Sequence, residues 1–106
     1  MSDARQTAGE KRDTRRAYRE KREAQIQELA ARLDLWEAKL RKAAAEGEIR
    51  YRAELEELRS KLEIARVRLS LLKDAGEAAW QEIRDGLDDA VDDLRRAVRK
   101  AASKFE

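Results

Sequence analysis

Apolar residues recur along most of this chain at the spacing that is typical of coiled-coil helices. From Ile26 onward they follow alternating steps of three and four residues, which places them on one face of a helix. Two successive steps of four after Gly47 shift the phase, and the alternation then resumes as far as Leu72. The residues of this line are Ile26, Leu29, Leu33, Trp36, Leu40, Ala43, Gly47, Tyr51, Leu55, Leu58, Leu62, Ala65, Leu69 and Leu72. The pattern predicts long amphipathic helices with a buried seam.

The last part of the chain, residues 77–105, follows an eleven-residue period instead. Eleven residues make three helical turns, so the repeat predicts one nearly straight apolar stripe along a helix. The repeating positions are Ala79, Ala90 and Ala101; Trp80, Val91 and Ala102; Ile83, Leu94 and Phe105; and Leu87 and Val98.

A second apolar row accompanies the first line. Its residues are Ala24, Ala31, Leu35 and Ala38, and further on Ile64, Val67 and Leu71. A stripe wider than a single seam suits helices that contact two neighbours. The second row therefore favours a bundle over a two-stranded coiled coil.

Two glycines divide the body of the chain into pieces of matched length. Gly47 and Gly76 separate 18–46, 48–75 and 77–105, each of which makes a helix of roughly 40 Å. We expect an all-α, antiparallel coiled-coil-like bundle of three helices with breaks near Gly47 and Gly76, the second glycine being a left-handed cap. The alternative is one long helix to about Gly76 plus a C-terminal helix, with the chain dimerising.

Composition supports helices and suggests how the chain is organised. Of the 106 residues, 45% are charged, against roughly 25% in an ordinary globular protein, and proline is absent. Up to Arg22 the chain holds eight basic residues and four acidic ones. We expect residues 1–13 to be a basic polar N-terminal tail and residues 14–106 to be a single helical coiled-coil domain.

The residues needed for most catalytic and metal sites are missing. The chain has no cysteine and no histidine, which removes thiolate chemistry, the commonest metal ligand and the commonest general base. Carboxylate pairs such as Asp85 and Asp89 are expected to be solvated on a helix surface. We expect no enzyme, no cofactor, no metal site and no small-molecule substrate. Without an apolar segment of roughly 18 residues or a signal peptide, the expected location is cytoplasmic.

The charges of the 77–105 segment are unevenly distributed. Acids precede bases along it, which complements the helix dipole but also places like charges one turn apart. Either a protein partner, such as a second copy lying antiparallel, or an anionic membrane surface would neutralise them. The candidate interaction residues are Trp80, Ile83, Leu87, Val91, Leu94, Arg95, Arg96, Val98, Arg99 and Phe105.

A basic stretch followed by heptads is also similar to the layout of basic-zipper DNA readers. The chain has no asparagine, one of the two side chains that usually read adenine, so nucleic acid is not expected as a partner. What remains is nonspecific nucleic-acid binding through the basic N-terminal arm, by contact with phosphates.

Four segments carry a family resemblance over about 18–105. It is to a family of small bacterial coiled-coil stress-response proteins first described in cyanobacteria, which the chain resembles in Tyr18-Arg-Glu-Lys, Leu33-Asp-Leu-Trp-Glu-Ala-Lys-Leu, Leu55-Glu-Glu-Leu-Arg-Ser-Lys-Leu and Ala79-Trp-Gln-Glu-Ile-Arg-Asp-Gly-Leu. The eleven-residue period is also similar to that of lipid-binding apolipoprotein and desiccation-protein helices. The family resemblance implies no catalytic residues. We expect a non-enzymatic, coiled-coil, self-associating interaction protein of bacterial stress response, with peripheral membrane binding through residues 77–105 as the alternative.

Overall fold

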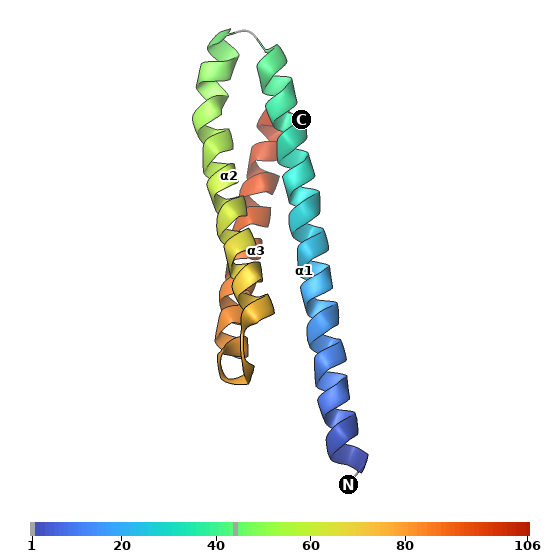
Figure 1. Ribbon diagram of the computed structural model, residues 1–106. Coiled ribbons are helices and arrows are strands. Elements are labelled where there is room, and N and C mark those ends of the chain that lie inside the picture. The colour runs from blue at the N-terminus through green and yellow to red at the C-terminus, as the bar shows by residue number, and fades with distance from the viewer. Residues whose placement is uncertain (1, 44) are drawn as a thin grey trace.

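The computed structural model of the chain describes residues 2–43 and 45–106, with side-chain surroundings for 9–43 and 49–106. Within these residues it forms three helices, α1 (Ser2–Lys42), α2 (Ala45–Asp74) and α3 (Glu77–Phe105). The helices run up, down and up in a rod of 67 × 19 × 19 Å (Figure 1). The expected all-α bundle of three helices is confirmed.

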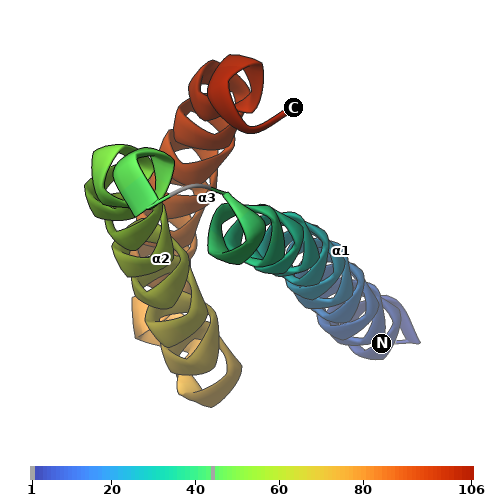
Figure 2. The same ribbon diagram turned by 90° about the horizontal axis from the view of Figure 1, so that it is seen from above.

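The core is a single apolar column where the three helices meet. Seen from above, the ends of the helices lie at the corners of a triangle (Figure 2). The predicted line supplies most of the column from α1 and α2, and the eleven-residue stripe supplies it from α3. Its most deeply buried large side chains are Trp36, Leu33, Leu62, Leu72, Leu87, Leu94, Val91 and Val98. Burial of these side chains holds the bundle closed.

Ion pairs fix the register between α1 and α2. The guanidinium of Arg59 donates hydrogen bonds to Asp34 and Glu37, at 2.7 and 2.5 Å. These bonds place residues 34–37 of α1 beside residue 59 of α2, as in an antiparallel hairpin.

The breaks lie close to the two glycines, but neither glycine acts as predicted. The first turn precedes Gly47, which belongs to the helical span of α2. Gly76 is not a left-handed cap: its φ of −76° and ψ of 173° are extended, and it is the N-cap of α3. The Ala75 N–H bonds to the Leu72 carbonyl, and the Gly76 carbonyl already accepts the Ala79 N–H. Only Ala75 and Gly76 connect α2 to α3, and Gly76 already serves as the N-cap of α3. The connection therefore contains no residue in the left-handed conformation.

Residues 2–13, which the sequence predicts to be part of an N-terminal tail, are helical, since α1 begins at Ser2. The segment lacks an apolar period, yet it also lacks proline and continues directly from a packed helix. Once a helix is nucleated, each added residue gains one further backbone hydrogen bond, so α1 can continue toward Ser2 without an apolar period. In Figure 1 its first turns run past the connection between α2 and α3.

The sequence favoured contact between the second apolar row and a second helix of the bundle. The structure does not show this contact. Each of the row's seven residues is exposed. The helix α3 packs instead against the side of α2 that carries Lys61 and Arg68, which bond to Asp93 and to the carbonyl of Gly86. Long basic side chains thus occupy the flank where the sequence suggested aliphatic packing.

Candidate interaction surfaces

The predicted interaction residues of α3 divide into two groups. Trp80, Leu87, Val91, Leu94 and Val98 are buried in the core. Ile83 and Phe105 are half-buried, whereas Arg95, Arg96 and Arg99 are exposed. The apolar stripe of α3 therefore closes the bundle, and only the arginines of the predicted set face solvent.

The acidic half of α3 is partly neutralised within the chain. Asp88 pairs with Arg22 of α1 at 2.8 Å, and Asp93 pairs with Lys61 of α2 at 2.6 Å. Two of the acids whose like charges suggested a partner thus have partners on the neighbouring helices. At the other end of α3, Lys104 pairs with Glu54 of α2 at 3.0 Å.

A cluster near the N-terminal end of α3, here the Tyr18 cluster, joins it to α1. It consists of Arg15, Tyr18, Arg22, Trp80, Arg84 and Asp88. The Tyr18 ring meets the edge of Trp80 with centroids 5.8 Å apart, and Arg15 lies over Trp80 at 4.6 Å. The Tyr18 hydroxyl donates to the Asp88 carboxylate, which also accepts from Arg22. Burial and the bond to Asp88 raise the pKa of Tyr18.

A second cluster, here the Phe105 cluster, joins the C-terminal end of α3 to α1. The Phe105 ring stacks on Trp36 with centroids 4.9 Å apart, and Tyr51 meets it edge-on at 5.7 Å. Arg32 donates two hydrogen bonds to the Glu106 carboxylate, at 3.0 and 3.1 Å. This bidentate contact lowers the pKa of Glu106 and raises that of Arg32.

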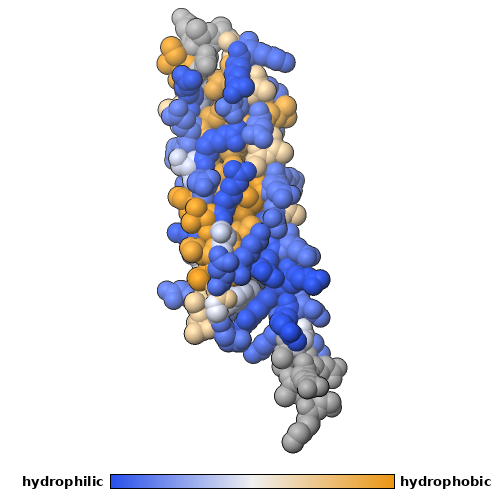
Figure 3. Space-filling model, in the orientation of Figure 1, coloured by the Kyte–Doolittle hydropathy of each residue, from blue (hydrophilic) through white to orange (hydrophobic). Residues whose placement is uncertain are grey.

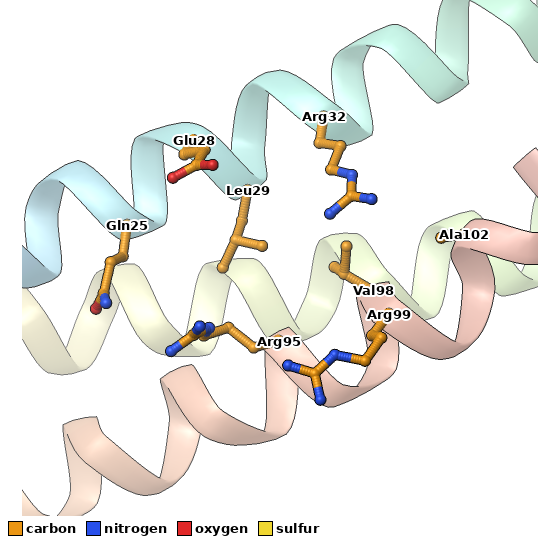
Figure 4. Close-up of a pocket in the computed structure, with 8 residues that line it drawn as sticks. All are labelled: Gln25, Glu28, Leu29, Arg32, Arg95, Val98, Arg99 and Ala102. Carbon is orange, nitrogen blue, oxygen red and sulfur yellow. The ribbon is translucent and has the colours of Figure 1, made fainter. Parts of the chain in front are cut away.

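Between the two clusters the boundary of α1 and α3 opens into a groove of about 370 Å³, here the α1–α3 groove (Figure 4). Leu29 of α1 and Val98 of α3 line it together with Ala102. Arg95 and Arg99 extend from α3 beside these apolar residues, and neither forms an ion pair with any described residue. The lining is completed by Gln25, Glu28 and Arg32. The groove thus combines an apolar floor with unpaired positive charge.

A second hollow, here the basic groove, lies between α1 and the end of α2. Its volume is about 440 Å³, and Trp80 and Leu72 contribute its apolar lining. Five of its nine lining residues are basic and one is acidic. The basic residues are Arg12, Arg15, Arg16, Arg19 and Lys73, and the acid is Asp13. The basic N-terminal arm of the sequence is thus part of a shaped surface.

The outer face of α2 carries an apolar strip, here the α2 stripe, formed by Ile64, Val67 and Leu71. Their exposed fractions are 48%, 50% and 52%. They lie on one helix face because they are three and four residues apart. Apolar side chains are visible over α2 in Figure 3, whereas polar side chains dominate the lower part of α1. The sequence pattern predicted these residues only as part of a second apolar row packed within the bundle.

The structure also bears on metal binding and on membrane insertion. Among the described residues, no group of three or more acidic side chains is placed to hold a metal ion. No helix in this part of the chain combines the length and the apolarity needed to cross a bilayer.

Comparison with protein-family models, with curated proteins and with solved structures finds no match for this chain. The resemblance to bacterial stress-response proteins therefore stays a prediction. The function has to be argued from the surfaces of the bundle.

Proposed function

We propose that this chain is a non-enzymatic helical interaction protein that self-associates through the α2 stripe. The observation that carries the proposal is the exposure of three aliphatic side chains, Ile64, Val67 and Leu71, on one face of a bundle whose core is otherwise closed. Single exposed aliphatic residues are common, but an ordered row of three on a helix is typical of a face that contacts another helix.

Burial of this row would stabilise an association without opening the bundle. Each side chain already has about half of its surface packed in the monomer, so a partner needs to cover only the outer half. Removal of apolar area from water is the main favourable term in most protein associations, and it needs no catalytic residue. A role in bacterial stress response belongs to this proposal only through the resemblance of the sequence.

Light scattering of the purified chain over a range of concentrations tests the proposal. The wild type is expected to show a mass that rises reversibly above that of the 12.3 kDa monomer. Leu71→Ser should lower the association, because it removes one aliphatic contact of the α2 stripe. Leu35→Ser is the matched control, since Leu35 on α1 is 53% exposed and Leu71 is 52% exposed. A wild type that stays monomeric at every concentration would refute the proposal.

Membrane binding by α3 has less support than self-association. The residues that would enter the lipid include Trp80, Leu87 and Leu94, all of which are buried in the core. The bundle would therefore have to open before α3 could lie on a membrane.

Nonspecific binding of nucleic acid is a second candidate function, and the basic groove is the observation that favours it. A groove with five basic residues attracts phosphate chains by charge, so binding should weaken steeply with salt. Fluorescence anisotropy with a labelled DNA duplex measures this directly. Reversal of Arg12 and Arg19 to Glu should abolish binding, whereas reversal of the exposed Arg50 and Arg66 should reduce it much less. Equal effects of the two double variants would contradict a site in the groove.

A further inference from the structure

We propose that the α2 stripe of one copy docks in the α1–α3 groove of a second copy, so that the chain associates head to tail. This inference rests on the proposed self-association and names the surface that receives the stripe. Three observations carry it: the place of the groove in the bundle, its length and its charge.

The groove lies where the bundle has room for another helix. The helix α2 packs along both of its neighbours, whereas α1 and α3 approach each other less closely. Aromatic contacts join α1 to α3 in the Tyr18 cluster and in the Phe105 cluster. Between them, Leu29 and Val98 lie at the floor of the groove, where they are almost fully buried at 9% and 1% exposed, and Arg95 and Arg99 extend beside them (Figure 4). A helix laid along this floor would pack against both α1 and α3.

The length and direction of the groove fit the α2 stripe. The groove is lined by residues 25–32 of α1 and 95–102 of α3, which is two turns of each helix. The stripe, residues 64–71, also covers two turns, so both surfaces are about 10 Å long. Since α1 and α3 run parallel, a docked helix can lie antiparallel to both, which favours the interaction of the helix dipoles.

The charges of the two surfaces are complementary. Arg95 and Arg99 lie on the rim of the groove, and Glu28 is the one acid among its lining residues. Beside the stripe, Glu57 and Glu63 are exposed and form no ion pair within the described part of the chain. Docking gives both carboxylates a cationic partner, and such complementarity selects the partner and its register.

The α2 stripe is a poorer partner for its own copy. The helix face that continues the stripe in both directions holds Glu57, Ser60, Ile64, Val67, Leu71 and Asp74, and the base beside it, Arg68, is bound to the Gly86 carbonyl. Two such faces would bury apolar area but leave their carboxylates unpaired. Docking into the groove is instead heterologous: every complex retains one free groove and one free stripe, so growth continues beyond the dimer unless a ring closes.

Charge reversal on each surface, followed by mixing, tests the inference on the full chain. Arg95→Glu with Arg99→Glu reverses the groove, and Glu57→Lys with Glu63→Lys reverses the stripe. Sedimentation velocity should show that each double variant alone associates at least about tenfold more weakly than the wild type. An equimolar mixture should associate again, because the reversed stripe fits the reversed groove and the native stripe fits the native groove.

Arg96→Glu with Lys100→Glu is the matched control. Both residues are exposed on α3 but do not line the groove, so association should be unchanged, and circular dichroism should show that all variants stay helical. Association that stops at the dimer and is lost only in the stripe variant would overturn the inference in favour of pairing between two α2 stripes. It would leave the proposed self-association intact. A mixture that fails to recover would also overturn the inference, and a monomeric wild type would overturn the proposed function with it.

Discussion

Trp36 occupies the centre of the contact between α1 and the C-terminal end of α3. Its side chain is fully buried and stacks on Phe105 at an interplanar angle of 12°. Trp36→Ala would remove this packing and leave a large cavity, so we expect a loss of about 3–5 kcal/mol in the free energy of unfolding. Urea unfolding followed by circular dichroism measures this loss.

The adjacent Leu35 provides the control for that prediction. Because its side chain is 53% exposed, Leu35→Ala should change the free energy of unfolding by no more than about 0.5 kcal/mol. Equal losses in the two variants would contradict the assigned orientation of α1.

Tyr18 links α1 to α3 through a group that can titrate. Burial and the hydrogen bond to Asp88 raise its pKa above the ordinary value of 10.0, although Arg22 acts in the opposite direction. Because the folded-state pKa is raised, the stability that Tyr18 contributes is complete below its ordinary pKa. It is lost as the pH rises through the folded-state value.

Ultraviolet absorbance of the phenolate measures this pKa directly. In a Tyr51→Phe background Tyr18 is the one tyrosine left, and its midpoint should lie above 10.0. Asp88→Asn should lower the midpoint, since it replaces the charged acceptor that favours the protonated hydroxyl with a neutral, weaker one. A midpoint below the ordinary value in the parent would show that the hydroxyl is not bound to Asp88.

At the scale of the helices, α3 contains one residue that weakens it. Gly86 lies in the helix interior, where glycine costs about 1 kcal/mol relative to alanine. A Cβ at this position would lie 3.9 Å from the nearest side-chain atoms of Arg68, which is ordinary contact. Gly86→Ala should therefore raise the free energy of unfolding by about 1 kcal/mol in urea melts. A loss of stability would mean that Arg68 needs closer access to the Gly86 carbonyl.

The contact between Glu106 and Arg32 should weaken in acid. Arg32 lowers the pKa of Glu106 below the ordinary value of 4.5, so the stability from this pair is present above that value. It is lost as the pH falls through the lowered folded-state pKa. Fluorescence of Trp36 in a Trp80→Phe background should report the change in the wild type but much less in Glu106→Gln. The same acid transition in both proteins would exclude Glu106 as its cause.

Periodicity was enough to predict the helices and most of the core. The seam from Ile26 to Leu72 and the stripe of α3 are buried almost as expected, because a face repeated over many turns has to be covered. The turns were harder to predict. Glycine suggested their positions, but hydrogen bonds such as that from Ala75 to Leu72 decide how each helix ends. The sequence does not reveal these bonds.

For the whole molecule, the sequence could not show what covers each apolar face. The stripe of α3 and the row of Ile64, Val67 and Leu71 are both apolar, yet one is core and the other is surface. The pairing of Arg22 with Asp88 joins residues 66 positions apart, so no local charge pattern predicts it. The α1–α3 groove arises from the way three helices pack and has no counterpart in a sequence motif.

Cysteine cross-linking of the whole chain reports whether the α2 stripe of one copy docks in the α1–α3 groove of another. The natural chain has no cysteine, so single cysteines can be introduced at Val67 in the stripe and at Ala102 in the groove. Mild oxidation of an equimolar mixture of the two variants should give mainly the mixed disulfide, identified by mass spectrometry. Each variant alone should form few dimers. A Val67→Cys homodimer as the main product, or no cross-link at concentrations where the wild type associates, would contradict head-to-tail docking.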